Sequence, residues 1–181
     1  MKKSMLTAVL LSAFSFGAMA ETPSFNFVEI GLTQFDNDDS SIEVDGFEFD
    51  FNYDFSENYY FSADYTDVED GQFDSTLTNL GFGYKSEISN YSTVFSQIDW
   101  ANIENNNGGD ENGYRLGVGI RSNFTRDLEL TAMYEYLDLD ESSNIYTVGA
   151  AYKVSNDYSV YADYKNSSDV DQFSVGVRFN F

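Results

Sequence analysis

The segment Phe173-Ser174-Val175-Gly176-Val177-Arg178-Phe179-Asn180-Phe181 decides the fold, because apolar residues alternate in it with small or polar ones. Side chains of a β-strand point in turn to opposite faces of a sheet, so this segment has one apolar face and one polar face. The segments 112–122 and 128–137 repeat the pattern, with Leu116 and Val118 on one face and Arg115 and Arg121 on the other. The alternation predicts a sheet whose two faces meet different surroundings.

Clusters of turn residues divide this alternating pattern into ten predicted strands. We expect them at 25–35, 42–53, 58–67, 75–85, 91–101, 112–122, 128–137, 144–153, 158–165 and 172–181. The segment 91–101 is the least regular, because Phe95 lies on the face opposite to Val94, Ile98 and Trp100. The expected fold is all-β, a closed antiparallel up-and-down transmembrane β-barrel of ten strands, with eight strands as the alternative.

The beginning of the chain has the features of a secretory signal. Lys2-Lys3 is followed by an apolar run from Met5 to Phe16 and by the small residues of Ala18-Met19-Ala20. We therefore expect a signal peptide over residues 1–20, cleaved before Glu21, and a barrel domain over residues 21–181. After Glu21 no stretch approaches the roughly 20 apolar residues that a transmembrane helix needs.

Volume decides which face of the barrel is expected to point inward. The interior of a ten-stranded barrel is only slightly wider than that of an eight-stranded one, which side chains already fill. The many Phe and Tyr residues, 18% of the chain together with Trp, would not fit there, whereas transmembrane barrels carry aromatic residues on the lipid side. We therefore expect the apolar face to contact the lipid of the outer membrane. The alternative is a soluble periplasmic β-barrel that binds an apolar ligand inside.

The connections between the predicted strands differ in length and charge. Those after odd strands are acidic and longer, at 36–41, 67–74, 102–111, 138–143 and 166–171. Those after even strands are short, as at 56–58 and 155–157. This asymmetry is typical of extracellular loops and periplasmic turns. Divalent cations are a candidate partner of the loop carboxylates, but no segment matches an EF-hand loop and we assign no metal site.

Charged residues on the inward face form a predicted lumen charge network of mixed sign. Its members are Glu29, Glu48, Asp50, Asp64, Lys85, Arg115, Arg121, Glu129, Glu135, Lys153, Asp163, Lys165 and Arg178. Because buried charges are tolerated only when they are paired, we expect these groups to bind one another and largely plug the lumen. The alternative is a narrow passive porin-like channel for small solutes or ions.

The last strand also carries a motif: a polar residue, a glycine and two aromatic residues at Ser174, Gly176, Phe179 and Phe181. The motif resembles the signal that the barrel-assembly machinery of the outer membrane recognises. The segments Phe61 to Tyr65, Met133 to Tyr136 and Val160 to Tyr164 resemble strands of the small OmpA-like and OmpX-like outer-membrane barrels. Phe27 to Leu32 and Gly46 to Phe51 resemble more closely the small exported barrels once linked to quorum sensing. The resemblance implies a barrel fold without implying one specific role.

The composition excludes several classes of function. With no His and no Cys, the chain cannot form a Ser-His-Asp triad, a Cys-His pair or a His-ligated metal site. We therefore expect no enzyme, no catalytic residue and no cofactor. A formal net charge of −22 opposes binding to nucleic acid. The expected protein is a monomeric outer-membrane barrel with a structural or surface-interaction role, in contact with lipid and lipopolysaccharide.

Overall fold

The structure is a computed structural model, and it describes residues 21–37, 40–70, 73–106, 109–168 and 170–181. The predicted signal peptide, residues 1–20, lies outside the described residues.

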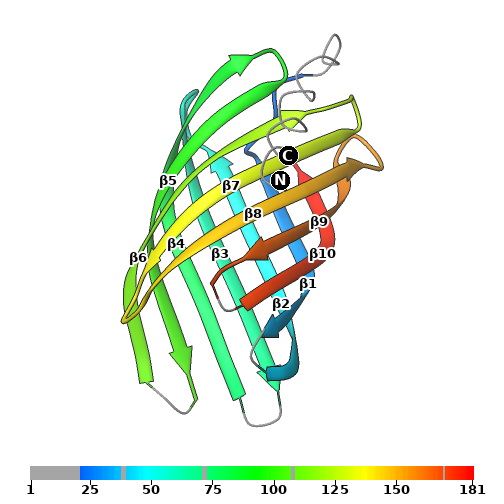
Figure 1. The fold of residues 1–181 in the computed structure, drawn as a ribbon. Coiled ribbons are helices and arrows are strands. Elements are labelled where there is room, and N and C mark those ends of the chain that lie inside the picture. The colour runs from blue at the N-terminus through cyan, green and yellow to red at the C-terminus, as the bar shows by residue number, and fades with distance from the viewer. Residues whose placement is uncertain (1–20, 38–39, 71–72, 107–108, 169) are drawn as a thin grey trace, which may run out of the picture.

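Ten antiparallel strands form one closed barrel, as the alternation predicts (Figure 1). The strands are β1 (Phe27–Asn37), β2 (Ser40–Asp54), β3 (Tyr59–Asp70), β4 (Phe73–Ser89), β5 (Ser92–Asn105), β6 (Gly109–Asn123), β7 (Leu128–Asp138), β8 (Ser142–Lys153), β9 (Tyr158–Asn166) and β10 (Val170–Asn180). Each strand pairs with its neighbours in sequence, and β1 closes the barrel against β10 from Phe27 opposite Asn180 to Asn37 opposite Val170. No sheet edge is left unpaired, which a wall in lipid requires.

We call the end of the barrel that holds Phe27 and Asn180 the proximal end, and the end with the connections after odd strands the distal end. The strands are longer at the distal end than the sequence predicts: β3 ends at Asp70 and β5 at Asn105, against predicted ends at 67 and 101. The predicted long loops at 67–74 and 102–111 are therefore wrong, because most of their residues belong to paired strands. Connections at both ends span only two to four residues. Polar residues such as Asp74 and Glu104 extend the ladder beyond the predicted strands, since backbone pairing in a sheet does not depend on apolar side chains.

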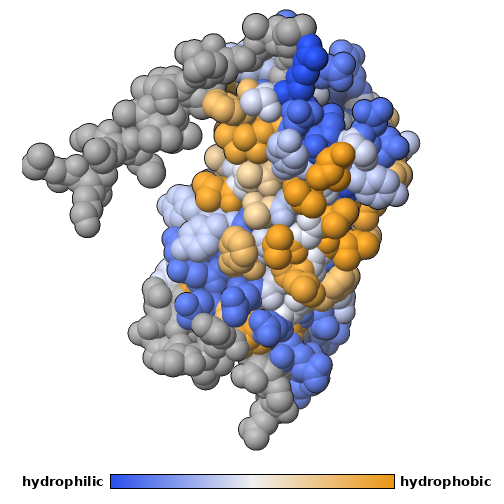
Figure 2. All heavy atoms as spheres, turned by 90° about the vertical axis from the view of Figure 1, so that its right-hand side faces the viewer, coloured by the Kyte–Doolittle hydropathy of each residue, from blue (hydrophilic) through white to orange (hydrophobic). Residues whose placement is uncertain are grey.

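Large apolar side chains cover the outer wall in an apolar belt, which Figure 2 shows on one side as orange residues between hydrophilic ends. Exposed members of the belt are Ile30, Leu32, Phe47, Leu80, Phe82, Val94, Ile98, Leu116, Val118, Leu130, Val148, Val160, Phe173, Val175, Val177 and Phe179. Exposed aromatic residues lie above and below the belt: Tyr65, Trp100, Tyr114, Tyr134, Tyr146 and Tyr164 towards the distal end, and Tyr53, Phe55, Tyr59, Tyr84, Tyr152, Tyr158 and Phe181 at the proximal end. Two aromatic girdles around an apolar band are typical of a barrel wall in a membrane. The predicted orientation, with the apolar face outward, is confirmed.

Beyond the belt, the distal rim of the wall has the opposite arrangement. We define the rim by its described strand residues, at 35–37, 40–45, 66–70, 73–78, 101–105, 109–113, 137–138, 142–145 and 170–172. By alternation its outward positions are largely acidic, at Asp36, Asp45, Asp67, Glu69, Asp74, Glu104, Asp110, Asp138 and Asp171. Its inward positions include Val68, Leu77 and Ile103. The rim is therefore built like a water-soluble barrel on top of a membrane-spanning one.

In the structure, inward and outward side chains alternate along β5, the strand that looked least regular in the sequence. Phe95 and Asp99 are buried on the inside, while Val94 and Ile98 are exposed on the outside. Among the residues that the structure describes, none forms a helix long and apolar enough to cross a membrane.

Candidate functional site in the barrel lumen

Arg115 on β6 is the centre of the first ion-pair cluster in the lumen. Its Nε lies 2.8 Å from Oδ2 of Asp99, its Nη1 lies 3.2 Å from Oε1 of Glu135, and its Nη2 donates to Asp64. These carboxylates come from β5, β7 and β3, so the cluster joins four strands across the lumen. Ser62 supports it by donating a 2.8 Å hydrogen bond to Asp99. Such a cluster is stable only while every partner is present, because each charge is withdrawn from water.

A second cluster lies nearer the proximal end, around Glu129 on β7. Oε1 of Glu129 accepts a 2.6 Å hydrogen bond from Nη1 of Arg178 and lies 3.4 Å from Nε of Arg121. Nε of Arg178 also donates to Oε1 of Glu29 at 2.7 Å. The second cluster therefore links β7 and β6 to the closing strands β10 and β1.

The segment that precedes β1 enters the lumen beside this cluster. Phe25 is 1% exposed and packs on Tyr60 and Phe95, with ring centroids 4.7 and 5.5 Å away. The guanidinium of Arg121 lies 4.5 Å from the centroid of the Phe25 ring, a favourable cation–π position. Arg121 also donates to the backbone oxygen of Ser24 at 3.3 Å. We call Phe25, Tyr60, Phe95 and Arg121 the aromatic plug.

Glu48 is held by hydrogen bonds from three side chains. Tyr161 donates to its Oε1 at 2.8 Å, and Ser174 donates to its Oε2 at 2.8 Å. Gln172 adds a longer bond of 3.3 Å. Three donors of this kind keep a buried carboxylate satisfied between β2, β9 and β10.

Glycines make room for the largest inward side chains. Tyr60 lies opposite Gly83 in the register, Phe95 opposite Gly119, and Tyr161 opposite Gly176. A Cβ atom at Gly83 would overlap the ring of Tyr60. The same pairing places Asp99 opposite Gly81. A large side chain can thus lie flat over a glycine in the tightly curved wall.

The structure places most of the predicted lumen charges inside and brings several together. Arg115 meets Asp64 and Glu135, and Arg178 and Arg121 meet Glu129. Lys85 pairs with Asp54 at 2.5 Å. Asp50, Asp163 and Lys165 also lie in strand positions of the inward face, and Glu48, Asp50, Glu135 and Asp163 act electrostatically on Lys165. Lys153 lies at the end of β8, where it is exposed and lines the proximal cavity.

Sequence reasoning missed Asp54, Asp99 and the aromatic residues of the lumen. Asp99 and Tyr60 both lie on the small or polar face of their strands, and each faces a glycine on the next strand. That pairing is the signal that could have found them. Phe25 carries no such signal, because it lies before β1.

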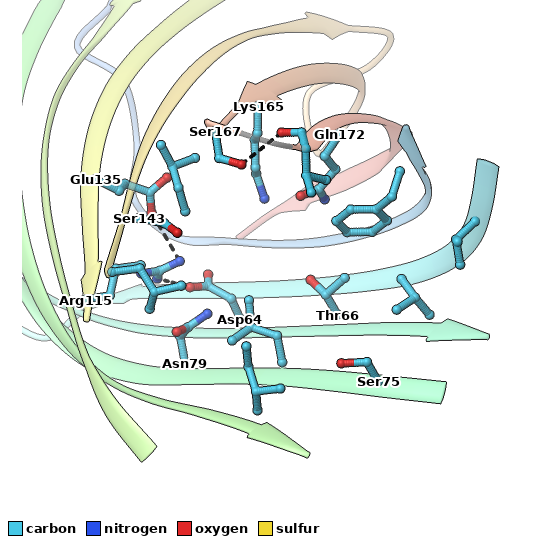
Figure 3. Close-up of a pocket in the computed structure, with 18 residues that line it drawn as sticks. Asp64, Thr66, Ser75, Asn79, Arg115, Glu135, Ser143, Lys165, Ser167 and Gln172 are labelled. Carbon is cyan, nitrogen blue, oxygen red and sulfur yellow. Dashed lines mark hydrogen bonds and ion pairs between the residues drawn. The ribbon is translucent and has the colours of Figure 1, made fainter. Parts of the chain in front are cut away.

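Two cavities lie at opposite ends of the lumen and share no lining residue. The distal chamber has a volume of about 600 Å³ and the proximal cavity about 290 Å³. Asp64, Arg115, Glu135 and Lys165 line the distal chamber, as Figure 3 shows. Its remaining wall holds an apolar ring with one side chain from each of eight strands: Phe35, Val44, Val68, Leu77, Ile103, Leu137, Ile145 and Val170.

The residues of the predicted assembly motif fall on both faces of β10 and just beyond it. Phe179 and Phe181 are exposed on the outer wall, where their rings stack 6.2 Å apart. Ser174 is buried in the lumen beside Glu48, and Gly176 lies against Tyr161. Within the described ranges, no group of three or more acidic residues is arranged to hold a metal ion.

The sequence model of the Gram-negative porins matches residues 11–172, which is most of the chain. The chain belongs to the Gram-negative porin family. No curated protein matches this porin significantly. Together with the apolar belt, membership of the family places the barrel in the outer membrane, as the sequence predicts.

Solved structures with the same architecture are small outer-membrane barrels. A KdgM porin in complex with disordered oligogalacturonate is 14% identical, with a TM-score of 0.50 over 86% of this chain and 98% of its own. The KdgM porin alone is 15% identical, again with a TM-score of 0.50, over 86% of this chain and 98% of its own. Neisserial surface protein A is 16% identical with a TM-score of 0.42, over 87% and 98% of the two chains. At these identities the likeness concerns the fold alone.

Proposed function

We propose that this porin is a closed, non-enzymatic barrel of the outer membrane with a structural and surface role. The observation that carries the proposal is the Arg115 cluster, in which one guanidinium binds carboxylates of three other strands across the lumen. The aromatic plug lies nearer the proximal end and adds a second obstacle of buried rings. An ion would have to displace both obstacles in order to pass.

The cost of opening supports the closed state. Separating Arg115 from its partners would leave Asp64, Asp99 and Glu135 close together without a compensating charge, which costs about 3 to 5 kcal/mol for a buried pair. A penalty of that size keeps an open form below about 1% of the population. We therefore expect the wild-type lumen to be shut to ions almost all of the time.

Planar-bilayer recordings test this proposal. The wild-type protein should give no discrete conductance steps. The triple variant Phe25→Ala/Phe95→Ala/Arg115→Ala should conduct, because it lacks the guanidinium of the first cluster and two rings of the aromatic plug. Val175→Ala and Val177→Ala, on the lipid face of β10, are the matched controls and should stay silent. Regular steps from the wild-type protein would overturn the closed state.

The second candidate is a narrow passive channel, which membership of the porin family and the two end cavities favour. In that case the acidic character of the protein, with a formal net charge of −22, would select cations. It would disfavour polyanionic sugars such as the oligogalacturonate in the KdgM complex. The same recordings decide, because a channel of this kind would show cation-selective steps in the wild-type protein.

We further propose that the distal rim faces the outside of the cell. Its acidic outer surface suits contact with lipopolysaccharide phosphates bridged by divalent cations. Since the chain has no cysteine, Glu104→Cys in the rim and Ser155→Cys in a proximal turn give single labelling sites. A membrane-impermeant maleimide should label the first in whole cells and not the second. The reverse result would invert the proposed orientation.

The terminal motif is proposed to guide insertion by the barrel-assembly machinery, after cleavage of the signal peptide before Glu21. Deleting Phe181 should strongly reduce the heat-modifiable, folded form in the outer membrane. Phe181→Tyr keeps an aromatic ring and is the matched control. Normal insertion of the truncated chain would contradict the assembly role, and the mass of the purified protein tests the cleavage site.

A further inference from the structure

The distal chamber combines an apolar wall with a polar floor. Its volume of about 600 Å³ falls in the range of sites that enclose a small organic molecule. The apolar ring lies in the rim, towards the distal ends of the strands. Asp64, Arg115 and Glu135, which Figure 3 labels, belong to the first ion-pair cluster and lie further towards the proximal end. A molecule with an apolar body and one polar group would fit this chamber, with its body against the apolar ring and its polar group at the polar floor.

Asn79 on β4 points into the chamber and has an unused hydrogen-bond acceptor. The residue is only 2% exposed, and its Oδ1 has no hydrogen-bond partner among the described residues. Asn79 lies directly opposite Asp64 in the register of β3 and β4. Leaving a buried acceptor unpaired is unfavourable, so this oxygen is a site for a donor that the protein itself does not supply.

The charge of the floor identifies the kind of donor. Arg115 is bound by Asp64, Asp99 and Glu135, so its positive charge is more than neutralised. Lys165 is opposed in turn by Glu48, Asp50, Asp163 and Glu135. Arg115, Lys165, Asp64 and Glu135 line the chamber and balance one another in formal charge. Asp99, Glu48, Asp50 and Asp163 are further carboxylates that act on these two cations without lining the chamber. The surplus of carboxylates around the floor gives it a negative potential, which a low-dielectric wall strengthens. A cationic donor is favoured over a neutral one, and an anion is disfavoured.

We propose that the distal chamber binds a small amphipathic organic cation. Its ammonium group lies at the floor, where it donates to Oδ1 of Asn79 beside the carboxylate of Asp64. Its apolar body lies within the ring, against side chains such as Val68, Leu77 and Ile103. The site lies at the distal end of the lumen, so binding does not require that the lumen conduct.

Equilibrium dialysis with the full barrel in lipid nanodiscs tests the proposal. The probes are phenethylammonium, phenethyl alcohol and 3-phenylpropanoate, which share a ring and differ in charge. Empty nanodiscs measure partition into lipid. We expect saturable binding of phenethylammonium and about tenfold weaker binding of the other two probes, as for the loss of one charge-assisted hydrogen bond.

Variants at neighbouring positions separate the chamber from the lipid face. Asn79→Leu should weaken phenethylammonium binding about tenfold, and Asn79→Asp should strengthen it, because it adds a negative charge beside the ammonium group. Leu77→Ser should weaken binding through the ring. Leu80→Ala is the control, because Leu80 follows Asn79 in the sequence and lies on the outer wall. This substitution should leave binding unchanged. Heat-modifiable migration confirms that each variant is folded.

Three results would overturn the proposal: no binding above that of empty nanodiscs, equal or tighter binding of 3-phenylpropanoate, or binding that neither substitution of Asn79 alters. None of these results bears on the closed state of the lumen, which the bilayer recordings test separately.

Discussion

The part of the wall within the apolar belt and the distal rim are built from the same ten strands, but with their faces exchanged. Within the belt, residues such as Val118 point outward and charges such as Arg115 point inward. In the rim, carboxylates such as Glu69 point outward and apolar residues such as Leu77 point inward. The strands run from one part into the other, and the register of β1 against β2 shifts within the rim, between Asp36 and Asn37. The surroundings of the wall, and not the pairing of the strands, therefore determine which residue type each face carries.

The lumen differs between the two parts in the same way. Within the belt it is filled by ion pairs and by the aromatic plug, because inward charges in a membrane-spanning barrel must find partners. In the rim, apolar side chains such as Leu77 and small polar ones such as Ser75 point inward, and they leave a chamber of about 600 Å³. Substitutions inside the belt should therefore cost much more stability than matched substitutions in the rim.

The largest difference is expected for removal of a charge. Arg115→Met leaves Asp64, Asp99 and Glu135 without their cation and should lower the free energy of unfolding by about 3 to 5 kcal/mol. Glu69→Gln removes an exposed charge of the rim and should cause no measurable change. Urea titrations of the protein in lipid vesicles measure both. Equal effects would mean that the Arg115 cluster does not stabilise the barrel.

Removal of an aromatic ring should give the next largest difference. Tyr60 is fully buried and donates a 3.0 Å hydrogen bond to Gln97, so Tyr60→Ala should cost about 3 kcal/mol. Phe35 lines the open chamber, so Phe35→Ala should cost less than about 1 kcal/mol. The same titrations apply. A large loss for Phe35→Ala would show that the rim is packed as tightly as the belt.

Addition of a charge tests the outer faces. Val118 is 54% exposed in the middle of the belt, and Val118→Arg should cost about 2 to 4 kcal/mol, because the guanidinium would face hydrocarbon. Glu104→Arg places the same side chain on the outside of the rim, where it faces water, and should be tolerated. Vesicle-based unfolding distinguishes the two. Tolerance at both positions would remove the lipid contact inferred for Val118.

The sequence predicts the number of strands and most of their inward and outward faces, because a period of two is visible in every strand except the segment 91–101. It does not predict where the membrane-spanning part of a strand ends. Asp74 and Glu104 were predicted to be loop residues from the composition of their segments, yet they pair in the ladder, where only their backbones are required. The sequence also did not predict the exchange of faces in the rim, where Leu77 points inward, because it does not mark the end of the membrane-spanning part.

The sequence predicts most of the charged residues that lie in the lumen, but it does not predict which of them form ion pairs with one another. Most of the charged lumen residues follow from parity, whereas the meeting of Arg115 with Asp64 depends on the closure and stagger of the barrel. Asp99 was missed because Phe95 made its strand look irregular. The entry of Phe25 into the lumen depends on contacts distant in sequence, which periodicity does not report.

The smallest difference in stability is expected when a small residue on the inward face of β4 is replaced by valine. Gly83→Val would place atoms in the space that the Tyr60 ring occupies, and displacement of a buried ring should cost about 1 to 3 kcal/mol. Ser75→Val, eight residues earlier on the same face of β4, would point into the chamber and should change stability by less than about 0.5 kcal/mol. Unfolding in vesicles again gives both values, and the phenethylammonium affinity of Ser75→Val reports whether the new side chain enters the chamber. If Gly83→Val were tolerated as well as Ser75→Val, the lumen within the belt would have free space, and neither the aromatic plug nor the contrast between the two parts could be maintained.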